Sequence, residues 1–254
     1  MTELVSQLIN RTINCHDFIE QVESQRDEEY IKILIELCQH KDKEQSIICF
    51  SYLYQNSYNR WALDRSLLKT DDINEIKAEF GKMTQAENKN PALVSNFYSN
   101  KDDQGKELFT FDDLKRASEE GDALAPCIIG HELNNEASIP YFKLAVKRGD
   151  YHAAFELMEI YFGKNRKIKV GKNMDKVYKY YVKGKKIKEN FDLDPNIYLE
   201  DPKLFAELLH YIYLQLTEKD ESIKKKEEMI TELLYEPGGR MYQEAKEHFE
   251  NCKL

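Results

Sequence analysis

The most distinctive chemistry in this sequence is a run of basic residues between Lys164 and Lys188. The run, KNRKIKVGKNMDKVYKYYVKGKKIK, holds eleven Lys or Arg and a single acid, Asp175, so its net charge is +10 while the whole chain carries −9. Such a run can bind an anionic surface, with tyrosines stacking on bases or anchoring at an interface. The candidate contact residues are Lys167, Lys169, Lys172, Lys176, Lys179, Lys183, Lys185, Lys186, Lys188, Tyr178 and Tyr181.

A plainer interpretation of the same run is a solvated helix face whose lysines point into water or pair with acidic neighbours. Charge runs are usually of this kind, so we favour it. The alternative is a binding surface for nucleic acid, an acidic protein or phosphoinositide headgroups. Nucleic acid as the sole partner fits poorly, because the sequence pI of about 5.3 lacks an overall basic character.

No pattern of catalytic or metal-binding residues accompanies this run. The six histidines form no HExxH motif and no Cys2His2 order, and the five cysteines form no CxxC pair. GxGxxG, GxxxxGK and GxSxG motifs are absent. The tripeptide Arg148–Asp150 matches an adhesion motif, but a basic last turn, a terminal glycine and an N-cap explain all three residues, so we set the adhesion interpretation aside. We therefore expect no enzymatic activity, no cofactor and no metal.

Composition favours an all-α protein. Gly and Pro number only 10 and 6 in 254 residues, well below their ordinary usage, and turn-rich β architectures need both. The scattered, odd number of cysteines suits a reducing compartment. The longest uncharged apolar run, 46–59, is too short and too polar to span a membrane, and the N-terminus lacks the features of a secretory signal. We expect a cytoplasmic protein.

Helical periodicity runs along the whole chain. The segment EQSIICFSYLYQN is apolar nearly all round, which predicts a helix buried between neighbours. Thr70 or Asp71 is expected to cap a helix carrying Ile73, Ile76 and Phe80 that ends at Gly81. A short helix is expected after Pro91, since proline suits the first helical turn.

A repeated pattern appears from Phe109 onward. Gly121-Asp122 and Gly149-Asp150 are each followed by an alanine-containing apolar helix, so each pair predicts a helix end and the next N-cap. Ala145 and Ala153 are expected where two antiparallel helices approach closely. Short helix hairpins bury only part of their apolar faces, so stacking of neighbours must complete the core.

The segment ASIPYFKLAVKRGDYHAAFELMEIYFGKNRKIKVGKNMDKVYKYYVKG resembles Sel1-like repeats, relatives of tetratricopeptide repeats. Family-like positions hold residues that include Ala137, Tyr141, Ala145, Gly149, Ala153, Leu157, Tyr161, Gly163, Asp175 and Tyr180. Met158, Val177 and Gly184 depart from the family pattern. The resemblance covers roughly a third of the chain and implies a superhelix of antiparallel helix hairpins.

The expected organisation has three parts: degenerate helical repeats at 1–108, Sel1-like repeats at 109–190 and capping helices at 191–254. The expected function, implied by the resemblance, is a non-catalytic protein–protein interaction scaffold or adaptor, with polyanion binding through 164–188 as the alternative. The family also includes secreted bacterial effectors, which leaves a host-cell location as an alternative to the cytoplasm. The resemblance transfers no binding residue and names no partner.

Overall fold

A computed structural model describes residues 2–10, 12–13, 15–23, 27–57, 70–102, 104–165 and 167–191, together with 204, 206–208, 210–212 and 214. Within these residues the regular structure is helical and no strand forms, which confirms the all-α class. One isolated bridge joins Lys101 to Glu107. No helix in this part of the chain is long and apolar enough to cross a membrane. The chain divides into two compact units, Met1–Glu132 and Leu133–Leu254.

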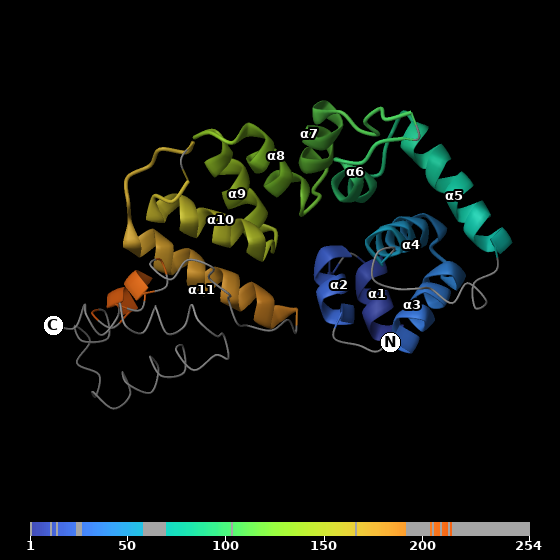
Figure 1. Cartoon of the computed structure of the whole chain (residues 1–254), viewed down its shortest axis with the longest axis horizontal. Coiled ribbons are helices and arrows are strands. Elements are labelled where there is room, and N and C mark those ends of the chain that lie inside the picture. Colours follow the sequence, from blue (N-terminus) through green and yellow to red (C-terminus); the bar gives the residue numbers. More distant parts are fainter. Residues whose placement is uncertain are drawn as a thin grey trace. The chain divides into compact units, whose positions relative to one another are not determined.

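The first unit is built around one central helix (Figure 1). This helix, α4 (Lys43–Ser57), contacts α1 (Thr2–Ile9), α2 (Cys15–Glu23), α3 (Asp27–Gln39), α5 (Thr70–Gln85) and α6 (Pro91–Phe97). Because it has neighbours on several sides, it carries apolar residues nearly all round, as the sequence predicts. Its buried residues Ile48, Phe50 and Leu53 are each at most 2% exposed.

The helix α5 runs four residues past the end that Gly81 was expected to impose. A glycine ends a helix when it turns into the left-handed conformation, and Gly81 is not among the glycines with positive φ. One helical glycine costs only about 1 kcal/mol relative to alanine, and the apolar period continues through Met83, so the helix runs on to Gln85. The expected end at Gly81 is therefore wrong.

Side-chain caps fix the start of the next two helices. Asn90 accepts a hydrogen bond from the Ala92 N–H at 2.9 Å. Pro91 lies in the first turn of α6, as predicted. Thr110 and Asp113 form a reciprocal capping box at the start of α7 (Phe111–Glu119). Asp122 then accepts hydrogen bonds from Leu124 and Ala125 N–H ahead of α8 (Ala125–Leu133).

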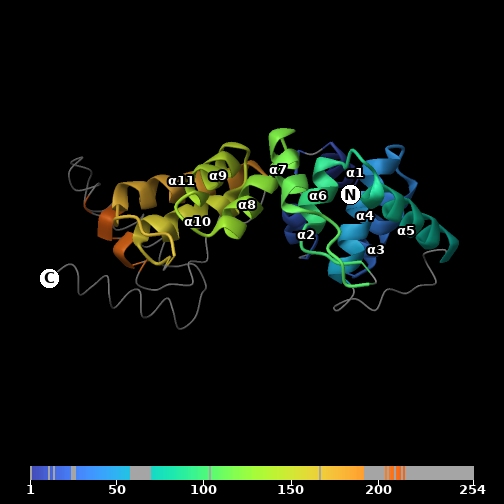
Figure 2. The same ribbon diagram turned by 90° about the horizontal axis from the view of Figure 1, so that it is seen from above.

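The second unit contains α9 (Ser138–Lys147), α10 (Tyr151–Phe162) and α11 (Met174–Asn190), seen from two directions in Figures 1 and 2. Gly149 adopts φ +96° between α9 and α10, and the buried Asp150 carboxylate caps α10 by accepting from the Ala153 N–H at 3.3 Å. Ala145 and Ala153 are fully buried in this pair of packed helices. The predicted roles of Gly149 and Asp150 and the predicted burial of Ala145 and Ala153 are confirmed.

The helices α10 and α11 pack side by side through aromatic rings and a glycine. Tyr161 of α10 and Tyr180 of α11 stack with centroids 5.9 Å apart and ring planes 2° from parallel. A Cβ placed on Gly184 would lie only 2.6 Å from the Phe155 ring. Gly184 therefore makes room for a phenylalanine of the neighbouring helix.

Candidate functional site

The basic residues singled out from the sequence fall into distinct environments around α11. Lys176, Lys179, Lys183 and Lys186 are exposed, whereas Lys185 is half-buried and Lys188 is 7% exposed. Lys167, Lys169 and Lys172 are exposed in the loop that leads into the helix. The helix thus presents only part of its lysine content to solvent.

Several lysines of this region lie over aromatic rings of α10 and α11. The Lys176 Nζ sits 4.5 Å from the Tyr161 ring centroid, and the Lys172 Nζ lies 4.5 Å from that of Phe162. The Lys188 Nζ lies 5.1 Å from the Tyr151 ring. Such contacts stabilise a cation by about 0.5–2 kcal/mol, so these lysines contribute to packing as well as to surface charge.

The two candidate tyrosines are engaged within their own unit. Tyr181 is 8% exposed. Tyr178 is half-buried and lies 5.8 Å, centroid to centroid, from the ring of Tyr211. Asp175 accepts a hydrogen bond from Tyr211, and Lys172 pairs with Glu207, so the residues described after 200 pack against the start of α11.

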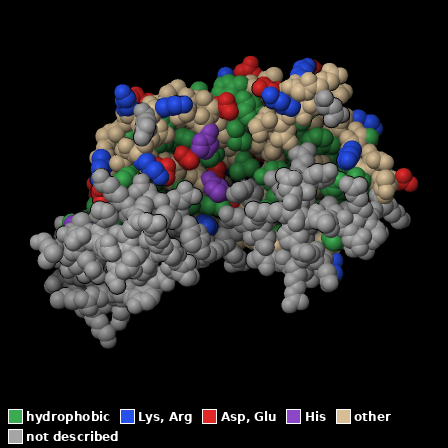
Figure 3. All heavy atoms as spheres, in the orientation of Figure 1, with side chains coloured by type: hydrophobic (Ala, Val, Ile, Leu, Met, Phe, Trp, Pro, Cys, Tyr) green, Lys and Arg blue, Asp and Glu red, His purple; other side chains and the backbone are tan. Residues whose placement is uncertain are grey.

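The four exposed lysines form a single row along the helix. Positions 176, 179, 183 and 186 are separated by three, four and three residues, which places them on one face. Val182, 44% exposed, lies beside this row. We call Lys176, Lys179, Lys183 and Lys186 the α11 lysine row. On the face shown in Figure 3, by contrast, lysines and arginines lie among acidic and hydrophobic side chains.

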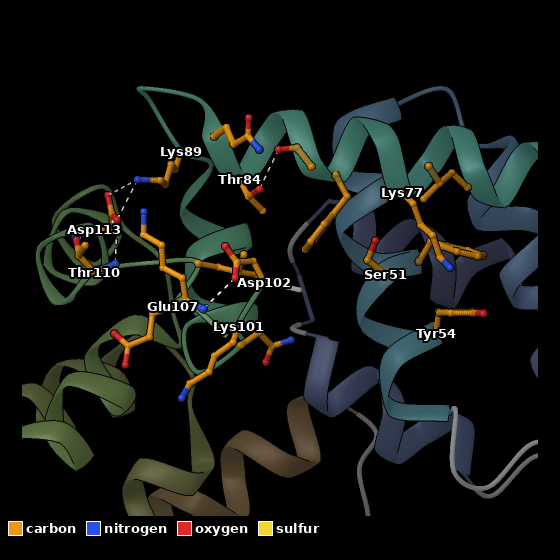
Figure 4. Close-up of a pocket in the computed structure, with 18 residues that line it drawn as sticks. Ser51, Tyr54, Lys77, Thr84, Lys89, Lys101, Asp102, Glu107, Thr110 and Asp113 are labelled. Atoms are coloured by element: carbon orange, nitrogen blue, oxygen red, sulfur yellow. Dashed lines mark hydrogen bonds and ion pairs between the residues drawn. The ribbon is translucent and has the colours of Figure 1, made fainter. Parts of the chain in front are cut away.

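A second candidate, which the sequence does not indicate, is a groove beside α5 in the first unit (Figure 4). Its volume is about 890 Å³, within the range typical of ligand sites. One wall is α5, another comes from Phe50, Ser51 and Tyr54 of α4, and a third comes from residues 100–113. We call this the α5 groove.

The wall that α5 contributes follows the helix axis. Ile76, Phe80 and Thr84 form one row at four-residue spacing, and Lys77, Gly81 and Gln85 form the adjacent row. The helix has no buried residue along its whole length. Its apolar side chains Ile73, Ile76, Phe80 and Met83 are only half-buried. An amphipathic helix normally buries that face, so α5 leaves apolar surface uncovered.

The third wall is a tight loop held by its own hydrogen bonds. The Asp102 carboxylate accepts from the backbone N–H groups of Gln104 at 2.9 Å and Lys106 at 2.8 Å. Backbone bonds from Asp102 N–H to the Lys106 carbonyl and from Leu108 N–H to the Asn100 carbonyl close the loop. It presents Lys101, Lys106 and Glu107 as exposed side chains at the groove.

The groove is nearly neutral although the unit around it is acidic. Residues 1–132 contain fifteen Lys or Arg and twenty-five Asp or Glu, a net of −10. The groove nevertheless holds four lysines, Lys77, Lys89, Lys101 and Lys106, and three acids, Asp102, Glu107 and Asp113. Lys89 pairs with Asp113 at 2.9 Å, and the Lys77 Nζ lies 5.5 Å from the Tyr54 ring centroid.

Burial is the largest single influence on the Asp113 carboxyl and raises its pKa. Hydrogen bonds from Thr110 and Lys89, together with the Lys89 charge, more than offset it and hold the pKa of Asp113 below its ordinary 3.8. Asp113 is therefore ionised at neutral pH and fixes one end of the groove.

A second cavity, of about 420 Å³, also borders α5 and has a net negative lining. It is lined by Asp72, Glu75 and Glu79 with Lys43, and Ile76 borders both cavities. Burial and the neighbouring Asp72 raise the pKa of the Cys38 thiol in its wall to about 11, against a small opposing effect of Lys43. A thiol of that pKa is a poor nucleophile at neutral pH.

Among the described residues, no group of three or more His, Cys, Asp or Glu could hold a metal ion. Both candidate surfaces combine lysines with aromatic or aliphatic side chains. No family model, no curated protein and no solved structure matches this chain.

Proposed function

We propose that the protein is a non-catalytic interaction scaffold that binds a segment of another protein in the α5 groove. The observation that supports this is the half-covered apolar face of α5, which forms one complete wall of an 890 Å³ groove and has no buried residue. Exposed apolar surface rimmed by polar residues is typical of protein interaction sites.

The proposal extends to the architecture of the second unit. Its Gly149-Asp150 junction, its buried alanines and the packing of α9, α10 and α11 agree with a Sel1-like, tetratricopeptide-related hairpin. We propose that the chain is a solenoid of such hairpins. Stacked hairpins commonly serve as binding scaffolds, so this architecture would suit the proposed function.

Site-specific photo-crosslinking tests the function. A photoreactive residue at Gln85, in the groove wall, is compared with the same residue at Ala78, an exposed position of α5 outside the groove. In cells that naturally make the protein, we expect a protein adduct from position 85 that is absent from position 78. Adducts that do not depend on the position would overturn the proposal.

A second candidate function is binding of a polyanion through the α11 lysine row. The observation that favours it is the exposure of four lysines on one helix face, within a segment of net charge +10. Neither Lys183 nor Lys186 pairs with an acid in the described chain. RNA, DNA and anionic vesicles are the relevant probes.

Charge reversal separates this candidate from simple surface charge. Lys179, Lys183 and Lys186 are changed to Glu, and the control changes the exposed Lys143 and Lys147 of α9 to Glu. Binding through several phosphates should weaken steeply as salt rises and should be lost only in the first variant. Equal loss in both variants would indicate a dependence on net charge alone and contradict the candidate.

A further inference from the structure

Two cysteines from different helices meet in the core of the first unit. Cys15 is the first residue of α2 and Cys49 lies within α4, and these two helices contact each other. The two cysteine side chains form a hydrogen bond, although the residues are thirty-four positions apart in the sequence. They are 5% and 2% exposed, and both are free thiols. The fold therefore brings together two thiols that the spacing of the cysteines in the sequence does not pair.

The surroundings of this pair keep Cys15 in its thiol form. The hydrogen bond with Cys49 is the largest influence, and it raises the pKa of Cys15 well above its ordinary value of 9.0. Burial and the negative charges of Cys49 and Asp122 raise this pKa further, and a backbone hydrogen bond opposes them. A single buried thiol of this kind is inert. A second thiol beside it allows one further reaction, because two adjacent sulfur atoms can join in a disulfide.

The arrangement of the pair suits that bond. The sulfur atoms of a disulfide are about 2.05 Å apart, so two thiols in hydrogen-bond contact must approach only a little further. Cysteine has a single side-chain torsion, and rotation about it moves the sulfur without moving the helix backbone. Because α2 and α4 already hold the two sulfur atoms side by side, a disulfide would join these helices in the positions that they occupy in the reduced protein.

We propose that Cys15 and Cys49 are a modification site, at which a peroxide joins the two thiols in a reversible disulfide between α2 and α4. One sulfur, as the thiolate, attacks hydrogen peroxide and breaks its O–O bond, which gives a sulfenic acid and one water molecule. The other sulfur displaces the sulfenic oxygen, which leaves as a second water molecule. The two thiols together lose two electrons and two protons, and the peroxide is reduced to water. This inference does not depend on the α5 groove.

The experiment treats the full chain with hydrogen peroxide, blocks the remaining thiols and identifies disulfides by mass spectrometry without reduction. Trypsin cleaves after lysine and arginine, so it places the five cysteines in five separate peptides. A bond between Cys15 and Cys49 joins peptide 12–26 to peptide 44–60. Cys15→Ala and Cys49→Ala each remove one partner. Cys127→Ala, which removes another buried cysteine of the same unit, is the matched control.

We expect the joined peptides 12–26 and 44–60 to be the main disulfide product in wild type and in Cys127→Ala. They should be absent from Cys15→Ala and Cys49→Ala, and dithiothreitol should separate them. A disulfide restricts the unfolded chain, so the oxidised protein should melt about 5–10 °C higher than the reduced protein. Peroxide should not raise the melting temperature of Cys15→Ala.

A second arm makes the result independent of how easily peroxide reaches a buried thiol. The reduced chain is unfolded in urea and refolded in a mixture of reduced and oxidised glutathione, so every cysteine can exchange before the core forms. The bond between Cys15 and Cys49 should again be the main one.

Three results would overturn the inference. If other pairings dominate, or no disulfide forms in either arm, the two thiols are not a modification site. If the bond forms only on refolding, a peroxide is not its oxidant and the proposed reaction is wrong. If the bond forms but lowers the melting temperature, the packing of α2 on α4 does not accommodate it.

Discussion

At the scale of single residues, Asp113 has two roles: it lines the α5 groove, and it forms part of the capping box of α7. Its carboxylate accepts from the Thr110 N–H at 3.0 Å and pairs with Lys89 at 2.9 Å and with Arg116 at 3.3 Å. Burial raises the pKa of Asp113, and the hydrogen bonds from Thr110 and Lys89 together with the Lys89 charge lower it by more. A carboxyl whose pKa is lowered in the folded state stabilises the fold above its unfolded pKa, and this contribution is lost as pH falls through the folded value.

We therefore expect Asp113→Asn to lower the free energy of unfolding by about 1–2 kcal/mol at pH 7. The difference from wild type should shrink as pH falls below the ordinary carboxyl pKa of 3.8. Urea titrations at several pH values measure this. Asp112→Asn is the control, because the Asp112 side chain is next in sequence to Asp113 but is 89% exposed. An equal effect of both substitutions would contradict the assigned role of Asp113.

Cysteine chemistry gives a second prediction at this scale. The Cys38 thiol has a pKa of about 11 because burial and Asp72 disfavour its thiolate, so about a thousandth of it is ionised at pH 8. Its alkylation rate should rise about tenfold per pH unit between pH 7 and 9.5, without a plateau. Peptide-resolved mass spectrometry follows this rate. A plateau near the ordinary thiol pKa of 9.0 would show that the burial and charge effects are absent.

At the scale of helices, Gly81 and Gly184 predict opposite effects of the same substitution. Gly81→Ala adds a methyl group to open space and should raise the free energy of unfolding by about 0.5–1 kcal/mol. Gly184→Ala places a Cβ 2.6 Å from Phe155 and should lower it by about 1–3 kcal/mol. Chemical denaturation of both variants measures the two values. Effects of the same sign would contradict the packing described for one of the two helices.

Helix ends can be predicted from the sequence where a capping residue fixes them. They cannot be predicted where the backbone conformation depends on packing against other elements. Gly149, Asp150 and Pro91 act locally, so their roles could be predicted from residue type alone. By the same local rule Gly81 is expected to end a helix, but α5 continues past it to Gln85. The groove was missed for a related reason, since its walls come from α4, α5 and residues 100–113, which periodicity cannot bring together.

At the scale of the whole molecule, the all-α class was predictable because it depends on composition and periodicity summed over many residues. The central position of α4 was predictable too, because its segment is apolar nearly all round. The half-covered face of α5 was not, since its apolar residues have the spacing of a face that is normally buried. The burial of the two helices differs sharply: α4 contributes several fully buried residues, and α5 contributes none.

Hydrogen exchange should reproduce this contrast. Amide protection follows burial and local packing, so α4 and α10 should exchange slowly in their units, while α5 should exchange faster. Mass spectrometry of peptides from 43–57, 70–85 and 151–162 measures the three helices. Protection of α5 equal to that of α4 would indicate that its apolar face is covered in solution, for example by self-association. The measurement repeated at several protein concentrations distinguishes that case.

The unequal surroundings of the α11 lysines have a consequence for covalent labelling. Acylating reagents attack neutral amines that solvent can reach, so Lys183 and Lys186 should be labelled early, and Lys188, 7% exposed over the Tyr151 ring, should be labelled late. Lys176 and Lys179 also contact rings, at 4.5 and 5.9 Å, yet remain exposed. The order in which these amines react thus records how α11 is rotated about its own axis.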